Sequence, residues 1–434
     1  MTSSTPTEST ARQRNCSQEK DLDALFKGTK RICIPIERDR YEEIVADRQA
    51  FRHHLDGLTR EYPELFPAAM AEGYILHGTL PPSKKMPEVR MRRIKMKSAE
   101  GGKEDVYTIC PSFVLPYMMG YSDEVEKPML LRSFGVPYWA LTYVFGRDDG
   151  YWERLDQRLG RSSIVGTTVK AVEDLPVHLL ADEKHSRLNG ERIYIATTVG
   201  QECILGASVA LDAGSDSLTE AYGHFKTESQ NLNPDYEPET VNIDGWTATQ
   251  IAWQRLFAGI TLILCFLHSF ISIRDRCKRM KDYYHEICRQ VWEVYHAPDP
   301  DIFKTRMAQL ASWARQTIPA GTGLDAILKL CIKAPLFLIA YDHPEAYRTS
   351  NMIDRHMEPM DRYLYSCRYF HGHLMSAEYH IRAWALLHNF RPYCPRSEIS
   401  SAYRSRAHRL NGFVYHENWL ENLLVSASMG GYRR

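Results

Sequence analysis

Residues 241–268 (VNIDGWTATQIAWQRLFAGITLILCFLH) constrain the fold more than any other stretch of this chain. A short apolar run ends in Asp244, a segment with helical spacing follows, and a second apolar run leads into Cys265-Phe-Leu-His268. This succession predicts a strand, a helix and another strand, and hence an α/β fold. Because an acid at the end of a buried strand is costly to keep, the Asp244 carboxylate is expected to face a site rather than bulk water.

Part of this stretch, residues 257–273, could be mistaken for a membrane span. It has only 17 residues (273 − 257 + 1), and His268 and two serines lie within it. That length is at the short limit for a spanning helix. A buried strand that runs into a helix explains the segment better, so we expect no membrane partner. A membrane-associated helical protein is the alternative.

The composition is typical of a globular cytoplasmic protein. The 434 residues suffice for two or three domains, and Lys+Arg and Asp+Glu balance at 54 each. Binding to a polyanion would therefore depend on local basic patches. Ten cysteines without a C-x-x-C pair indicate reduced thiols. The polar residues 1–30 are expected to be a disordered tail, with no apolar core of a signal peptide.

Residues 31–122 are expected to form a small α+β module. Helical spacing predicts an amphipathic helix over residues 39–59. Residues 83–97 (SKKMPEVRMRRIKMK) partly alternate like a strand with one basic face, and a second strand could pair with it across a turn at Gly101-Gly102. The basic face either protects a sheet edge or contacts DNA phosphates. The candidate DNA-binding residues here are Lys84, Lys85, Arg90, Arg92 and Arg93.

Residues 123–174 are predicted to be helical. Three short helices precede one that Ser162 or Ser163 could cap, an order that suits a DNA-binding helix-turn-helix. Arg161, at the start of that last helix, is a further candidate for DNA contact. A plain helical linker is the alternative.

From residue 175 the pattern changes to strands. Three strand-like runs, a helix, a fourth strand, a second helix and a fifth strand follow one another, with a tight-turn signal at Asn189-Gly190. The order βββαβαβ, with Asp182 and Asp244 at the ends of the first and fourth strands, is that of a ribonuclease-H-like mixed sheet. The expected divisions are a core of residues 175–269 and 348–390, an all-helical insertion of residues 270–347, and a basic C-terminal segment of residues 391–434.

A third acid follows the insertion. Residues 349–390 are predicted to form a helix that Thr349 or Ser350 caps, with Asp354 in its first turn. Carboxylates from different elements can hold two divalent ions about 3.5–4 Å apart, as phosphodiester chemistry requires. Mg²⁺ (or Mn²⁺) needs only a few carboxylates besides substrate oxygens, so three acids would suffice.

The order of these motifs resembles a known family. Asp182 and Asp244 are followed by Cys265-x-x-His268 and then by Thr349-Ser-Asn-Met-Ile-Asp354-Arg355. This is similar to the Mutator-type DDE transposases of bacterial insertion sequences, in which a C-x-x-H follows the second aspartate and a T-x-N-x-x-E-R helix carries the third acid. The resemblance covers about residues 175–390.

The resemblance implies a DNA transposase in which Asp182, Asp244 and Asp354 are catalytic metal ligands. Such an enzyme cleaves the element ends and joins the freed 3′-hydroxyls to target DNA with Mg²⁺ or Mn²⁺. The implied partner is double-stranded DNA, both terminal inverted repeats and target, bound by a homo-oligomer in the bacterial cytoplasm at the nucleoid. The alternative is a catalytically inactive or domesticated DNA-binding protein derived from such an enzyme.

The sequence departs from the family at the third acid, because Asp354 stands where glutamate is usual. Glu358 lies one helical turn further along the same face and is the rival ligand. Asn351 and Arg355 set the register and favour Asp354. Arg355 itself would contact a phosphate, or else form an ion pair on the helix surface with Glu358 or Asp361.

Cys265 and His268 form half of a zinc-binding pattern. A zinc site needs about four ligands, and no second pair has suitable spacing nearby. We therefore expect the pair to pack near the site or to touch the DNA end, as the resemblance suggests, or to be a buried structural pair. Glu183 is expected to point to the opposite face from Asp182. The acids Asp212, Asp216 and Glu220 fit a solvated loop and a helix N-terminus.

Overall fold

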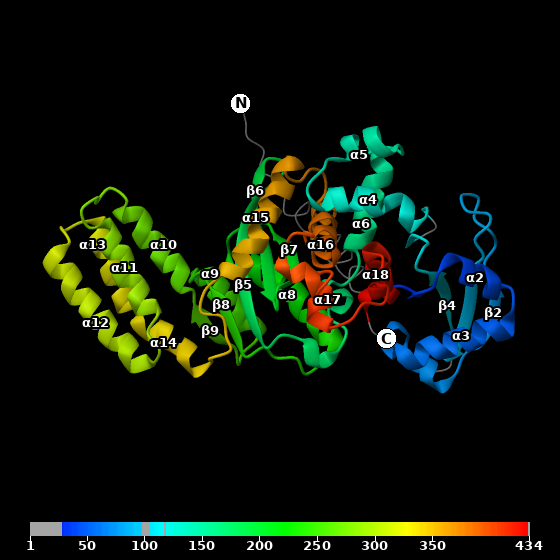
Figure 1. Cartoon of the computed structure of the whole chain (residues 1–434), viewed down its shortest axis with the longest axis horizontal. Coiled ribbons are helices and arrows are strands. Elements are labelled where there is room, and N and C mark those ends of the chain that lie inside the picture. The colour runs from blue at the N-terminus through cyan, green and yellow to red at the C-terminus, as the bar shows by residue number, and fades with distance from the viewer. Residues whose placement is uncertain (1–27, 98–103, 117–118, 433–434) are drawn as a thin grey trace, which may run out of the picture.

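The computed structural model describes residues 28–97, 104–116 and 119–432. Two mixed sheets, of four and five strands, and many helices make this a mixed α/β protein. Figure 1 shows three parts in a row, with the five-stranded sheet between a helical bundle at one end and the four-stranded sheet at the other.

The N-terminal sheet has the strand order β1-β4-β3-β2. Its strands are β1 (Arg31–Ile34), β2 (Ile75–Thr79), β3 (Arg92–Lys97) and β4 (Glu104–Pro111). The predicted pairing of the basic strand with its successor is confirmed, since β3 and β4 are antiparallel. The turn at Gly101-Gly102 and the expected tail over residues 1–27 lie outside the described residues.

The single helix predicted over residues 39–59 is in fact two helices, α2 (Arg38–Val45) and α3 (Arg48–Glu61). The break has a local cause. The Asp47 side chain accepts hydrogen bonds from the amides of Gln49 and Ala50, and so caps the start of α3.

Four helices connect the two sheets, as the helical prediction for residues 123–174 required. They are α4 (Ser122–Ser133), α5 (Tyr138–Phe145), α6 (Asp149–Gly160) and α7 (Ile164–Thr168). Ser163 caps α7 by accepting from the Gly166 amide. However, α7 has only five residues and is mostly buried, so it offers little surface to a DNA groove. DNA binding by this segment stays a prediction.

The second sheet has the order β7-β6-β5-β8-β9. Its strands are β5 (His178–Leu188), β6 (Glu191–Gly200), β7 (Cys203–Ala210), β8 (Thr240–Ile243) and β9 (Thr261–Leu264). The first three are antiparallel to one another, whereas β8 and β9 are parallel to β5. The predicted succession of elements is confirmed, including the hairpin turn, where both Asn189 (φ 52°) and Gly190 (φ 89°) are left-handed.

Helices cover both faces of this sheet. α8 (Ser215–Leu232) and α9 (Thr247–Leu256) pack on the face to which Leu179 and Ala181 point. α15 (Asn351–Ser366) and α16 (Leu374–Phe390) pack on the opposite face, that of Leu180. Because side chains alternate along a strand, Asp182 belongs to the α15 face and Glu183 to the α8 face.

Residues 349–390 form two helices rather than the single helix predicted. α15 ends before Arg368 and Tyr369, which both have left-handed φ angles (54° and 67°), and α16 begins at Leu374. The chain therefore reverses, and α16 runs back through the core.

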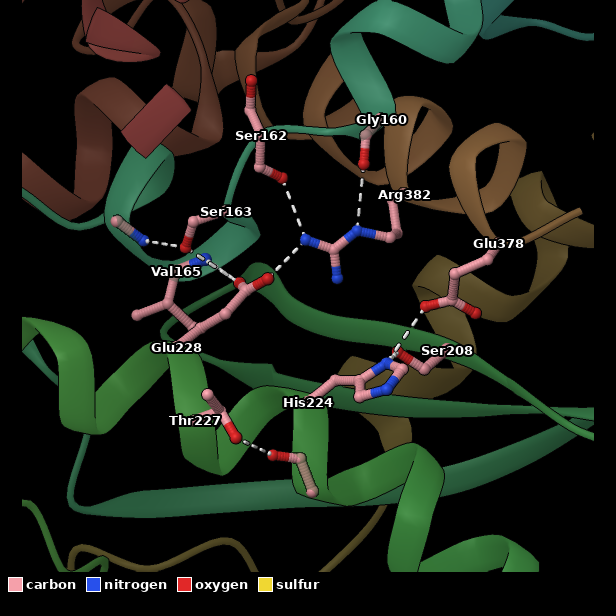
Figure 2. A network of polar contacts seen from close by, with 12 residues as sticks. Gly160, Ser162, Ser163, Val165, Ser208, His224, Thr227, Glu228, Glu378 and Arg382 are labelled. Carbon is pink, nitrogen blue, oxygen red and sulfur yellow. Dashed lines mark hydrogen bonds and ion pairs between the residues drawn. The ribbon is translucent and has the colours of Figure 1, made fainter. Parts of the chain in front are cut away.

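A buried polar network holds α16 in place (Figure 2). The Arg382 guanidinium on α16 donates to the Glu228 carboxylate on α8 and to the carbonyl oxygens of Gly160 and Ser162. Glu228 also accepts from the Ser163 hydroxyl at 3.0 Å. Nearby, Glu378 on α16 contacts His224 on α8. These contacts satisfy the charges that packing has removed from water.

The insertion is all-helical, as predicted, but it begins at residue 266 because β9 ends at Leu264. Its helices are α10 (Phe266–Cys277), α11 (Tyr284–Tyr295), α12 (Pro300–Thr317), α13 (Thr322–Ile332) and α14 (Ala334–Asp342). They share a separate apolar core. In the described ranges, every helix is too short or too polar to traverse a lipid bilayer.

The C-terminal segment was predicted to be basic, but much of its charge is neutralised internally. Arg391 is buried and donates to the Ser133 carbonyl oxygen, while Arg404 and Arg409 form ion pairs with Glu417 and Glu202. The helix α18 (Trp419–Ser426) packs between the two parts of the molecule that carry the sheets.

Candidate active site

Asp182 and Asp244 lie side by side on neighbouring strands. Leu180 of β5 is the register partner of Asn242 of β8 in a parallel pairing. Two residues further along each chain, Asp182 stands opposite Asp244, where β8 has ended. β5 continues to Leu188, so Asp182 lies inside its strand and not at the strand end that was predicted.

Backbone groups orient both carboxylates. The Asp244 Oδ1 atom accepts from the Trp246 amide at 2.7 Å, and the Asp182 Oδ1 atom accepts from the Glu183 amide at 2.9 Å. Gly245 makes the turn out of β8 with a φ of 93°, and a Cβ atom there would lie 2.5 Å from the Leu264 Cδ1 atom. The turn that positions Asp244 therefore requires glycine.

The third acid comes from α15, which lies over β5 (Figure 1). Asp354 is in the first turn of this helix, and its Oδ2 atom accepts from the Ser350 hydroxyl at 3.0 Å. Glu358 is exposed instead and forms an ion pair with Arg362. Of the two rivals, the geometry brings Asp354 to the other aspartates.

The three aspartates interact electrostatically. Burial, together with the charges of Asp244 and Asp354, raises the pKa of Asp182 from 3.8 to about 6, against the opposing effect of His268. Asp182 therefore interacts with each of the other two aspartates.

Cys265 and His268 connect α10 to α15 beside these acids. Cys265 precedes the first residue of α10, and its Sγ atom accepts from the Ser350 amide at 3.2 Å. The hydrogen bond to Cys265 raises the pKa of His268 to about 9, and the charges of Asp182 and Asp244 act in the same direction. Although burial opposes it, the hydrogen bond and charge of His268 lower the pKa of Cys265 overall. His268 is thus a cation at neutral pH, next to the carboxylates.

The donor set suits a hard cation, but not a single closed site. Within the part of the chain that the structure describes, no group of three or more His, Cys, Asp or Glu side chains is arranged to hold one metal ion. Asp182 interacts with both Asp244 and Asp354, and these carboxylates would hold Mg²⁺ or Mn²⁺ together with water and phosphate oxygens.

Two residues next to the aspartates have hydrogen-bond partners that the sequence did not indicate. Ser350 precedes α15 as predicted, but its hydroxyl contacts Asp354 and makes no capping bond. Glu183 does face away from Asp182, where it accepts from the Tyr222 hydroxyl at 2.8 Å and the Thr249 hydroxyl at 2.6 Å. Burial raises the pKa of Glu183 to about 7. The sequence alone does not show that Glu183 of β5 meets Tyr222 of α8 and Thr249 of α9.

The basic candidates are dispersed over the molecule. Lys84, Lys85 and Arg90 are exposed on the N-terminal module, which Figure 1 shows at the opposite end from the insertion. Arg92 is not available to DNA, because it is buried and donates to the carbonyl oxygens of Val45 and Ala46 at the end of α2.

The other basic candidates differ in their surroundings. Arg93 is half-buried. Arg161 is exposed and lies 5.1 Å from the ring centre of Tyr379. Arg355 is exposed on α15 next to Asp354, while its predicted partners are paired elsewhere, Glu358 with Arg362 and Asp361 with Lys184.

No protein-family model matches this chain, and no curated protein sequence matches it significantly. Any assignment of function therefore depends on the geometry of the aspartates and their neighbours.

Proposed function

We propose that this protein is a DNA transposase with a ribonuclease-H-like catalytic core, of the Mutator DDE type. The observation that carries the proposal is that Asp182 stands opposite Asp244 on the neighbouring strand and also interacts with Asp354 of α15, so that three separate elements supply the acids. The strand order β7-β6-β5-β8-β9, with three antiparallel strands followed by two parallel ones, supports it.

The reaction would be hydrolysis at the element ends, followed by attack of the freed 3′-hydroxyl on target DNA. Divalent ions held by Asp182, Asp244 and Asp354 would activate the attacking oxygen and stabilise the leaving one. The protein orients these acids through the Trp246 amide and the Ser350 hydroxyl. The His268 imidazolium offsets part of their negative charge before substrate binds.

The proposed partner is double-stranded DNA, bound by a homo-oligomer in the bacterial cytoplasm. Exposed basic residues on the N-terminal module (Lys84, Lys85 and Arg90) and on α15 (Arg355) support contact with a long polyanion. Mg²⁺ or Mn²⁺ is the proposed cofactor, because carboxylates supply the donors. Nucleoid association follows from DNA binding.

Replacing Asp244 with asparagine tests the proposal. This change keeps the size and the hydrogen bond from Trp246 but removes the charge, so cleavage and strand transfer should be lost while DNA binding persists. The assay is gel analysis of an end-labelled duplex from the termini of the element, with Mg²⁺. Undiminished cleavage by the variant would refute the proposed mechanism.

The alternative is a catalytically inactive, DNA-binding descendant of such an enzyme. It is favoured by the departure at position 354, where aspartate replaces the usual glutamate. Wild-type protein that binds the duplex but never cleaves it, under any divalent ion tested, would select this alternative.

A further inference from the structure

A small basic cavity opens beside Asp244 and His268, between α10 and α13 of the insertion. Its volume is about 180 Å³. Since a water needs about 10–15 Å³ of such space, the cavity can admit several waters or a phosphate group.

The spacing of the polar residues in the two helices points them to this cavity. Ser269, Ser272 and Arg276 follow one another at i, i+3 and i+7 in α10, and so share one face of that helix. Lys329 and Lys333 are four residues apart at the end of α13. The apolar faces of the same helices pack together in the core of the insertion.

The charge of the cavity is unbalanced. Arg276, Lys329 and Lys333 line it, and Asp244 is the one acid among its described lining residues. Over the described ranges, none of these three cations forms an ion pair with a carboxylate.

Some other cations of the insertion are paired with acids. Lys278 pairs with Asp275, and Arg289 and Lys304 pair with acids on their own helices. What distinguishes Arg276, Lys329 and Lys333 is that they line one small space, and together they make it favourable for an anion.

We propose that this cavity binds a backbone phosphate of the DNA strand that enters the active site, adjacent to the phosphate that is cleaved. The serine hydroxyls and the three cations supply the donors that phosphate oxygens accept from. The insertion thereby positions the strand over Asp244. The identity of the ligand as DNA rests on the proposed function, whereas the anion site rests on the cavity itself.

The test compares two triple variants with equal charge loss. The cavity variant is Arg276→Gln, Lys329→Gln and Lys333→Gln, and the control is Lys278→Gln, Arg289→Gln and Lys304→Gln, on other surfaces of the insertion. The probe is a fluorescein-labelled 30-base-pair duplex of mixed sequence with a 3′ single-stranded extension. Fluorescence anisotropy in EDTA gives its affinity between 50 and 200 mM KCl.

The cavity variant should bind about tenfold more weakly. Its log–log salt slope should fall by about 0.7 for each phosphate of the single strand that the protein no longer neutralises, hence by about 0.7 to 1.4 for one or two phosphates. The control variant should keep the wild-type slope. Lys329→Gln alone, at an exposed position, should show part of the effect, and circular dichroism checks that each variant is folded.

Equal affinity and equal slope for the cavity and control variants would overturn the inference. That outcome with active wild-type protein leaves the proposed transposase function intact. Conversely, loss of binding in the cavity variant, with wild-type protein that never cleaves DNA, supports the phosphate site and refutes the proposed reaction. Displacement of the probe by millimolar inorganic phosphate from wild-type but not from the cavity variant would show that the site takes a free anion as well.

Discussion

The free energy of unfolding of the wild-type protein should fall as the pH rises, because Glu183 is buried. Replacing Glu183 with glutamine should abolish this part of the pH dependence. Glu183 is enclosed between β5, α8 and α9, and burial raises its pKa from 4.5 to about 7. In the unfolded chain it ionises near pH 4.5, while in the folded protein it keeps its proton until about pH 7. A raised carboxyl pKa therefore stabilises the fold fully below pH 4.5, and this contribution is lost as the pH rises to 7.

The magnitude follows from the difference between the two pKa values. That difference (7 − 4.5), at about 1.36 kcal/mol for each pKa unit, amounts to about 3 kcal/mol. Glutamine is neutral at every pH and keeps a carbonyl oxygen for the hydroxyls of Tyr222 and Thr249. Relative to wild type, the free energy of unfolding of the variant should rise by about 3 kcal/mol between pH 4.5 and pH 8.

Urea unfolding followed by circular dichroism, in EDTA at pH 4.5, 6, 7 and 8, measures this difference. Glu220→Gln is the matched control, because Glu220 is exposed on α8 and its replacement should leave the pH dependence of wild type unchanged. Asp182 titrates in all three proteins, and its repulsion with an ionised Glu183, which the variant lacks, acts in the same direction. If Glu183→Gln and wild type lose stability in parallel over this range, burial of Glu183 is not the cause and the reasoning fails.

Three further predictions concern the third acid, the core and the basic residues. Asp354→Asn should lower the rate of cleavage of an element-end duplex by more than about 100-fold, because a lost metal ligand removes several kcal/mol of transition-state stabilisation. Glu358→Gln should remain active, because Glu358 is paired with Arg362. The reverse result would make Glu358 the ligand. Arg382→Leu should cost about 3–5 kcal/mol in urea unfolding, because Glu228 is left buried and unpaired, and an unchanged midpoint would contradict this. The double variant Lys84→Gln, Lys85→Gln should bind duplex DNA more weakly, and the slope of its log affinity against log salt should fall by about one to two. Arg92→Met should lower only the thermal stability, because Arg92 caps α2. A binding defect in Arg92→Met would show that this arginine reaches DNA.

The order of strands and helices in the second half of the chain was predictable because each element has an unambiguous local pattern. β7 and β9 are nearly continuous apolar runs, β5 begins with one, and the helices between the strands show helical spacing. Errors occurred at the ends of elements, where one hydrogen bond or backbone angle decides. Asp47 divides one expected helix, and the left-handed Arg368 and Tyr369 divide another.

The sequence could not show which arginines are free to bind DNA, because that depends on contacts with residues far away in the chain. Arg92 caps a helix that lies 47 residues earlier in the chain, at Val45. Arg382 is bound to Glu228, 154 residues away, inside the core. A single sequence indicates where charge is, but not which charges have been neutralised by folding.

The sequence by itself determined the succession of elements and the position of Asp244 after its strand, because each apolar run and its end can be recognised locally. It did not show that β5 continues beyond Asp182 to Leu188. The tertiary structure alone decided how these acids are completed. Asp354 and Glu358 are one helical turn apart, so spacing cannot separate them, but the packing of α15 over β5 places Asp354 near Asp182 and leaves Glu358 with Arg362 in solvent. The basic cavity beside Asp244 likewise exists only because α10 and α13, far apart in the chain, pack together and turn their polar faces to the same side.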